Sequence, residues 1–130
     1  NVKLNYLEDV LSRKSLVADY YHKRLSQIER LEVPSNSQFT SHTYHQYTLK
    51  VKDEKRDDLK SFLMKKNISS KIYYPLPLHL QNAYKKYHTG QPIQNSEQLC
   101  KEVLSIPIHS ELSEVQLEYI CSRIEEFYNK

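Results

Sequence analysis

Glycine is almost absent from this sequence, and its absence constrains the fold and function more than any other feature. Gly90 is the single glycine among 130 residues, where ordinary usage of ~7% would give about nine. Loops that cradle a phosphate need clustered glycines, because backbone N–H groups must approach the anion and some residues must adopt a positive φ. The sequence therefore excludes a Walker loop, a dinucleotide-binding fingerprint and a kinase-type glycine loop within this chain.

The length fits a single domain with one hydrophobic core. Charged residues make up 27% of the chain and the mean hydropathy is −0.74, and no run approaches the ~18 apolar residues of a membrane span. Two cysteines, Cys100 and Cys121, are too few for a disulfide framework, so we expect reduced thiols in a cytoplasmic protein. Because the chain begins at Asn1 and not at Met, we expect a processed or excised piece.

The net charge of +3 arises from an interleaved pattern. Residues 50–66 contain seven basic and four acidic side chains, and five glutamates from Glu111 onward stand against Arg123 and Lys130. Nucleic-acid binders usually show a basic stripe, so this mixture favours a solvated surface.

Apolar residues recur every three or four positions through the first thirty residues, which predicts one long amphipathic helix over residues 1–31. Alternation over residues 43–51 predicts a half-buried strand, with His45 and Tyr47 in the core. Asp53 is expected to cap a helix that starts at Glu54 and ends near Asn67.

The second half of the chain shows weaker patterns. Residues 71–74 and 105–109 are expected to form short strands, both limited by proline. Residues 80–87 are expected to form a short helix. A further helix, capped by Asn95 or Ser96, is expected to run to about Leu104. Ser113 and Gln116 form a capping-box pattern before a final amphipathic helix. The fold class is therefore α+β, with a small, three-stranded, mainly antiparallel sheet covered by helices.

The residues give little sign of metal or thiol chemistry. A strand would place His42 and His45 on opposite faces, and the other histidines and cysteines lack the close spacing of zinc sites. Both cysteines occupy apolar helical positions, which is typical of small buried hydrophobes rather than nucleophiles.

One local cluster is a candidate binding loop. Tyr73 and Tyr74 precede two prolines and His79, so aromatic faces and a titratable ring lie on a stiff segment. The residues alone leave a binding loop and a structural turn equally open.

Two motifs identify a family resemblance. Residues 73–84, YYPLPLHLQNAY, resemble the (H/Y)-Y-P-x-P-L-H-x-Q-x-A-(Y/F) segment of DegT-type nucleotide-sugar aminotransferases, and residues 102–112, EVLSIPIHSEL, are similar to their E-V-L-S-L-P-(M/I)-H-P-x-L. Residues 2–7 resemble the middle of a long helix in these enzymes, and residues 45–47 resemble a strand near the start of their small domain. The resemblance covers the whole chain but only the last third of a family member.

The resemblance implies that residues 1–130 are the C-terminal small domain of a type I aminotransferase fold, with residues 1–31 cut from the inter-domain helix. It implies transamination of a nucleotide-linked keto-sugar with pyridoxal 5′-phosphate, with glutamate as the common amino donor. The family's Schiff-base lysine and its glycine-rich segment are missing here. We therefore expect no catalytic, cofactor-binding or metal-binding residue in this chain, which should be inactive alone.

By the resemblance, His79 is the first candidate to bind the sugar nucleotide, followed by Tyr74 and then Tyr73, where the family often has histidine. The intact enzyme is expected to be a cytoplasmic homodimer that binds neither nucleic acid nor membrane, and this chain should expose an apolar side along its first helix. The alternative is a regulatory module that binds nucleic acid or a protein.

Overall fold

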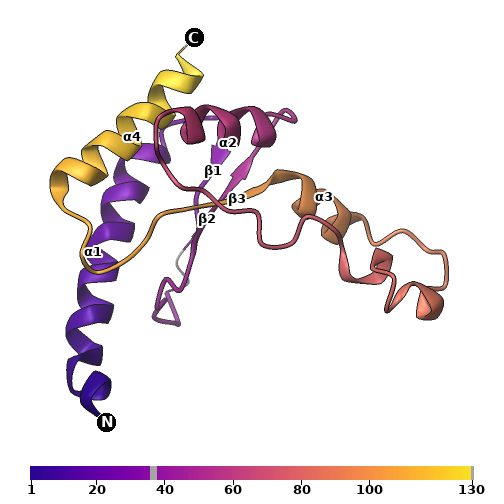
Figure 1. The fold of residues 1–130 in the computed structure, drawn as a ribbon, viewed down its shortest axis with the longest axis horizontal. Coiled ribbons are helices and arrows are strands. Elements are labelled where there is room, and N and C mark those ends of the chain that lie inside the picture. Colours follow the sequence, from indigo (N-terminus) through magenta and orange to yellow (C-terminus); the bar gives the residue numbers. More distant parts are fainter. Residues whose placement is uncertain (36–37, 130) are drawn as a thin grey trace.

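The computed structural model describes residues 1–35 and 38–129, which form a helical layer against a small sheet (Figure 1). The helices are α1 (Leu7–Leu25), α2 (Arg56–Lys65), α3 (Gln94–Glu102) and α4 (Glu114–Tyr128), with 3₁₀ turns η1 (Val2–Tyr6), η2 (Leu78–Leu80) and η3 (Lys85–Tyr87). The strands are β1 (Leu31–Glu32), β2 (Tyr47–Val51) and β3 (Val103–Ile106).

The three strands form one antiparallel sheet in the order β1-β2-β3. Leu31 pairs with Val51, and Leu49 pairs with Leu104. Since successive side chains of a strand point to opposite faces, this register sets Tyr47, Leu49 and Val51 on one face, and all three are buried. The expected α+β class with a three-stranded antiparallel sheet is therefore confirmed.

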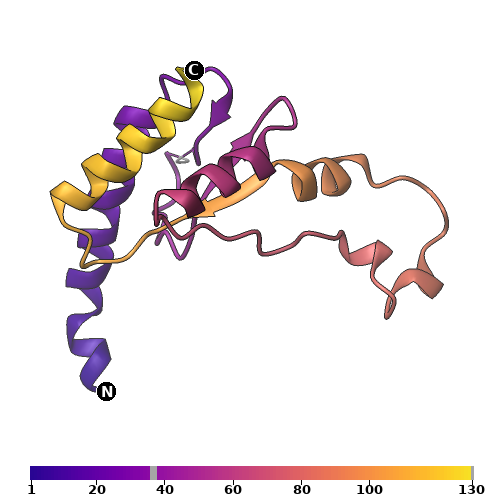
Figure 2. The ribbon, with the colours of Figure 1, turned by 45° about the horizontal axis from the view of Figure 1, so that its top comes forward.

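The core lies on that face of the sheet. Helices α1, α2 and α4 contribute Tyr21, Leu59 and Ile124, which are fully buried in a single apolar cluster with the strands. Figures 1 and 2 show α1 and α4 side by side, and α2 lies next to α4. Cys100 and Cys121 are free and buried as expected, and burial raises the pKa of the Cys121 thiol to about 12.

The first helix is shorter than the predicted span of residues 1–31. It begins with the 3₁₀ turn η1, and α1 ends at Leu25, with Ser26 as its C-cap. Leu31 instead pairs with Val51 in β1 and is buried in the core.

Three further predictions around β2 are wrong. The strand begins at Tyr47 and not at residue 43, since Tyr44 has a φ of +46°; His45 is exposed and does not belong to the core. Helix α2 begins at Arg56 without a side-chain cap, because Asp53 and Glu54 both adopt positive φ in a turn.

The C-terminal end of α2 follows the expectation for Asn67. Its φ is +59°, its N–H donates to the carbonyl of Met64, and the N–H of Ile68 donates to that of Leu63. This pair of bonds is the Schellman motif, in which asparagine here takes the place usually given to glycine.

The segments after α2 are more irregular than predicted. Only Lys71 of residues 71–74 pairs with the sheet, through a bridge to Ser105. Residues 80–87 form no α-helix, and the 3₁₀ turns η2 and η3 lie on either side of residues 81–84. The last strand covers Val103–Ile106 instead of residues 105–109, so α3 ends at Glu102, two residues before Leu104. The predicted capping box of α4 is confirmed: Gln116 N–H donates to Ser113 Oγ, and Ser113 N–H donates to Gln116 Oε1.

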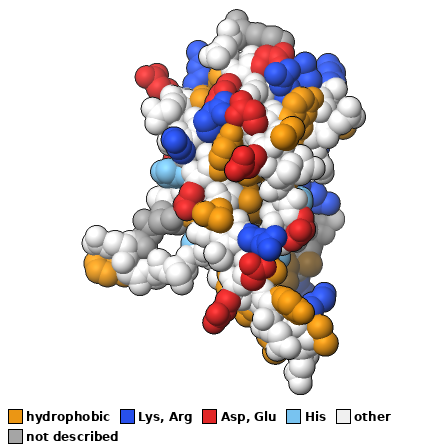
Figure 3. Space-filling view, turned by 90° about the vertical axis from the view of Figure 1, so that its left-hand side faces the viewer, with side chains coloured by type: hydrophobic (Ala, Val, Ile, Leu, Met, Phe, Trp, Pro, Cys, Tyr) orange, Lys and Arg blue, Asp and Glu red, His pale blue; other side chains and the backbone are white. Residues whose placement is uncertain are grey.

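The outer surface of α1 and α4 mixes both signs of charge, and hydrophobic side chains gather toward the lower end (Figure 3). Val2, Leu4, Tyr6 and Leu7 are all exposed there, so the expected apolar side of the first helix is present at its N-terminal end. Within the described residues, no helix has the length and apolarity needed to cross a bilayer.

Candidate functional site

The face of the sheet opposite the core carries mainly polar side chains and is partly covered. Gln46, just before β2, and Thr48 are half-buried and alternate with the buried residues of that strand. On β3, Val103 is half-buried and Ser105 is buried. The hydroxyl groups of Thr48 and Ser105 lie 2.8 Å apart and form a hydrogen bond across the strands. This face is free to line a site because α1, α2 and α4 all pack on the other side.

Residues 73–102, which we call the arm, lead away from the sheet and return to it through α3 (Figures 1 and 2). Pro75 and Pro77 stiffen its first part by fixing φ. The carbonyl of Pro77 accepts the N–H of Leu80, and the carbonyl of Gln81 accepts that of Tyr84. The arm is therefore shaped mainly by its own local hydrogen bonds and by α3.

A hollow of about 640 Å³ lies between the arm and this face of the sheet, and we call it the sheet hollow. Its floor is made by Thr48, Lys71 and Ser105, and its apolar wall includes Leu76 and Leu99. Both candidate tyrosines line it: Tyr73 is 48% exposed and Tyr74 is 71% exposed. A mostly apolar hollow with a few convergent polar groups is the usual form of a small-molecule site.

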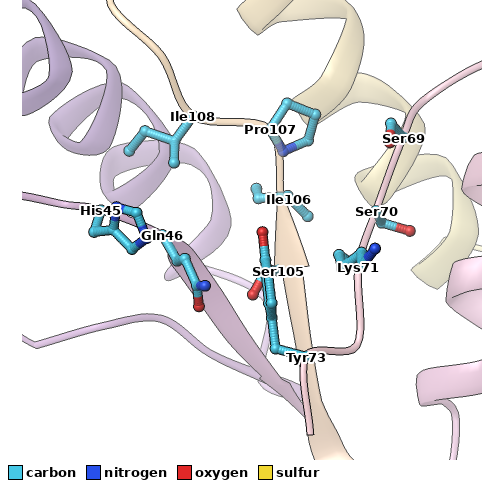
Figure 4. Close-up of a pocket in the computed structure, with 10 residues that line it drawn as sticks. All are labelled: His45, Gln46, Ser69, Ser70, Lys71, Tyr73, Ser105, Ile106, Pro107 and Ile108. Carbon is cyan, nitrogen blue, oxygen red and sulfur yellow. The ribbon is translucent and has the colours of Figure 1, made fainter.

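A smaller polar hollow of about 180 Å³ adjoins the sheet hollow, with Gln46, Lys71, Tyr73 and Ser105 common to both. Figure 4 shows His45 and Gln46 on one side, Lys71 on the other and Ser105 of β3 between them. The backbone of Lys71 is fixed there by two hydrogen bonds of 2.9 Å with Ser105.

His79 lies in a different place. It lines a third hollow of about 410 Å³ at the outer part of the arm, together with Tyr84, Tyr87 and His88. Leu78, Ile93 and Ser96 border both this hollow and the sheet hollow. The structure thus brings Tyr73 and Tyr74 together and separates His79 from them by a wall of side chains.

The His79 ring is held in position by α3. Its Nε2 lies 3.1 Å from Glu97 Oε1, and its side chain is 10% exposed. The same Glu97 oxygen accepts the backbone N–H of Ile93. These hydrogen bonds, first that of Ile93 and then that of His79, lower the pKa of Glu97 and keep it ionised.

Sequence reasoning missed Gln46, Thr48, Lys71 and Ser105 as lining residues. The alternation over residues 43–51 contained the signal for the first two, because it places them on the face opposite the core. It gives no indication that this face lines a hollow. Nothing in the local sequence linked Glu97 to His79, which stands 18 residues earlier.

The lining of the sheet hollow does not fit pyridoxal phosphate by itself. The cofactor requires a lysine for the Schiff base and a carboxylate beside the pyridine nitrogen. Among the described residues that line this hollow, Lys71 is the only lysine, and no Asp or Glu is present to hold the pyridine nitrogen. A metal fits no better, since residues 1–35 and 38–129 bring no three His, Cys, Asp or Glu side chains together.

Comparison with known proteins gives a consistent picture. The model of the DegT/DnrJ/EryC1/StrS aminotransferase family matches residues 1–125. A dTDP-3-amino-3,6-dideoxy-alpha-D-galactopyranose transaminase of Aneurinibacillus thermoaerophilus is 30% identical over 98% of this chain and 34% of its own length. A protein of Geobacillus stearothermophilus named "Pleiotropic regulatory protein" is 44% identical over 67% of this chain and 23% of its own length.

Solved structures agree with the sequence relatives. An aminotransferase from Brucella abortus superimposes with a TM-score of 0.89 at 35% identity, over 98% of this chain and 34% of that one. S. venezuelae DesV, solved with a ketimine intermediate, superimposes with a TM-score of 0.90 at 26% identity, over 99% of this chain and 34% of that one. This chain spans 34% of the length of three of these proteins and 23% of the length of the fourth.

Proposed function

Because the chain belongs to the DegT/DnrJ/EryC1/StrS aminotransferase family, we propose that it is the C-terminal part of a pyridoxal phosphate-dependent aminotransferase acting on a nucleotide-linked keto-sugar. The observation that carries the proposal is the match of almost the whole chain to one third of a dTDP-sugar transaminase, at 30% identity. Membership of this family does not depend on which sugar is the substrate.

In the proposed enzyme, this chain supplies one wall of the substrate site and the rest of the protein supplies the cofactor. The rest of the protein would hold pyridoxal phosphate, which would supply the chemistry for transfer of an amino group to the keto-sugar from a donor that we propose to be glutamate. Tyr73 and Tyr74 offer ring faces and hydroxyl groups in the sheet hollow, and His79 offers a ring nitrogen at the arm. We further propose that the enzyme is a cytoplasmic homodimer.

The direct test uses the full-length protein and a panel of keto-sugars linked to dTDP, UDP and GDP, with glutamate as donor. Glutamate-dependent amination of at least one keto-sugar is expected, and its absence across the panel would contradict the substrate class. His79→Ala should raise KM for the sugar nucleotide about tenfold, the loss of one hydrogen bond worth ~1.4 kcal/mol, without changing the absorbance of the bound cofactor. His109→Ala is the matched control, because His109 lies outside all three hollows and its Nδ1 accepts the N–H of Glu111.

A second test concerns this chain alone. Incubation of residues 1–130 with pyridoxal phosphate and borohydride should label surface lysines weakly and at several positions. Stoichiometric labelling of one lysine would show that this chain holds the cofactor itself and would overturn the division of labour proposed above.

One observation favours a different function, a regulatory module. The relative that is 44% identical over 89 residues is named a regulatory protein. Nucleic-acid affinity that falls steeply with salt would support that function. The mixed charges on the surface in Figure 3 argue against it, because they form no basic stripe on that face.

A further inference from the structure

The geometry around His79 determines which of its ring nitrogens is available to a ligand. Nε2 lies 3.1 Å from Glu97 Oε1, and Glu97 stands in the first turn of α3. The His88 ring packs against the His79 ring with 4.6 Å between the centroids. The ring is therefore fixed from two sides, by a hydrogen bond and by an aromatic contact.

The hydrogen bond assigns the proton of the ring. An ionised carboxylate can only accept hydrogen bonds, and the oxygen involved already accepts the N–H of Ile93 at 3.1 Å. The proton in the hydrogen bond between His79 and Glu97 must then be carried by Nε2. The protonated nitrogen of a histidine is inferred in this way from the group to which it is hydrogen-bonded. In the neutral ring, Nδ1 consequently has a lone pair and no proton.

A lone pair at Nδ1 selects the chemistry of the ligand group that it meets. It accepts a hydrogen bond from a hydroxyl group, whereas an ionised phosphate offers no proton to it. In a nucleotide sugar the hydroxyl groups lie on the sugar and on the ribose of the nucleoside, and a nucleoside diphosphate without its sugar distinguishes the two.

We propose that Glu97 is a positioning residue, which holds Nε2 of His79 so that Nδ1 faces the substrate as an acceptor for a sugar hydroxyl. This rests on the function proposed above, since His79 touches substrate only in that enzyme. Glu97 itself acts through His79 and makes no contact with the substrate.

The first experiment measures the tautomer without any substrate. In ¹⁵N-histidine-labelled residues 1–130, NMR at pH 8, where a typical imidazole is neutral, should show the Nε2–H form of His79 in large excess. Glu97→Ala should shift His79 toward a mixture of tautomers, whereas Glu97→Gln, whose amide oxygen can still accept, should retain more of the Nε2–H form. His109 is the internal reference, because its Nδ1 accepts a backbone N–H and its tautomer should not change. Equal tautomer populations for His79 in the unaltered chain would overturn the proposal.

The second experiment measures substrate binding in the full-length enzyme. For the sugar nucleotide that the panel identifies, Glu97→Ala should raise KM about threefold to tenfold, because the ring loses its fixed orientation as well as part of its Nε2–H form. The inhibition constant of the same nucleoside diphosphate without its sugar should change less than about twofold, because no hydroxyl of the sugar is involved. Glu97→Gln should restore KM to near its original value.

Two results would contradict the proposal in this assay. An inhibition constant that rises together with KM would mean that Glu97 only caps α3, and an unchanged KM would mean that it positions nothing. If the full-length protein aminates no sugar in the panel, the proposed function fails, while the NMR measurement still decides whether Glu97 fixes His79.

Discussion

Tyr21 and Tyr47 are the two largest fully buried side chains, and their hydroxyl groups are in different situations. Their rings lie 5.1 Å apart. Tyr21 Oη donates to the carbonyl of Pro107 at 2.8 Å, whereas Tyr47 Oη has no hydrogen-bond partner among the described residues. Burial raises the pKa of both phenols, so both stay neutral.

Replacing each tyrosine with phenylalanine should therefore give opposite results. Tyr21→Phe leaves the Pro107 carbonyl without its donor, so the free energy of unfolding should fall by ~1–2 kcal/mol. Tyr47→Phe removes a buried hydroxyl that has no partner in the part of the chain that the structure describes, so stability should stay the same or rise. Urea unfolding followed by circular dichroism measures both, and equal losses in the two variants would contradict this account.

Glu118 joins α4 to α1 at the surface. It accepts hydrogen bonds from the Tyr20 hydroxyl at 2.7 Å, from Arg24 Nη1 at 2.5 Å and from Ser122 Oγ at 2.9 Å. These bonds, with that of Tyr20 first, lower the pKa of Glu118 to about 2. Arg24 also holds Glu125 through Nη2 at 2.7 Å.

A carboxyl group with a lowered pKa gives a stability that depends on pH in a defined direction. Its contribution is complete above the ordinary value of 4.5 and is lost as the pH falls toward 2. Thermal unfolding at pH 6 and at pH 3 should therefore show a larger drop in Tm for the unaltered chain than for Glu118→Gln. Glu114→Gln, at an exposed position of the same helix, is the control and should behave like the unaltered chain.

At the scale of elements, the sequence predicts features that depend on neighbouring residues and does not predict those that depend on contacts between distant segments. The cap and apolar spacing of α4 lie within the helix itself, and both appear in the structure. The two-residue strand β1 has no periodicity to detect. The turn at Asp53 and Glu54 uses positive φ without glycine, so the usual residue signal is missing. Residues 71–74 touch the sheet through the bridge of Lys71 to Ser105, which is a contact between distant segments.

The candidate site divides in the same way. Tyr73, Tyr74 and His79 stand out because they belong to one short motif. Gln46 and Ser105 join the site only when β2 pairs with β3, and Glu97 joins His79 only when the arm folds back. Contacts between distant segments depend on the packing of the whole fold, which a single sequence does not display.

The capping box of α4 can be tested by removing one of its two bonds. Ser113→Ala loses the oxygen that accepts the N–H of Gln116, so the free energy of unfolding should fall by ~1 kcal/mol. Ser113→Thr keeps the hydroxyl and should lose less than ~0.5 kcal/mol, because threonine also caps helices well. Chemical denaturation measures both, and an unchanged free energy of unfolding in Ser113→Ala would mean that this bond adds nothing to stability.

At the scale of the whole molecule, the arm differs in what stabilises it from the helices and sheet outside it, which we call the body. The buried core cluster joins α1, α2, α4 and the sheet. The arm adds Cys100 from α3 to the buried residues, but η2 and η3 bury none. Regions with few buried apolar contacts open at low free-energy cost, so the arm should open well before the body.

Limited trypsin digestion of residues 1–130 tests this difference. The first cut should fall at Lys85 or Lys86, which are exposed in η3, and the fragments should stay associated through the core. An equally early cut at Lys60, within α2, would contradict a stable body. In the full-length protein the same two lysines should be cut more slowly if the arm forms part of a substrate site, and adding the sugar nucleotide should slow the cut further, because ordering the arm around a ligand raises the free energy of local opening.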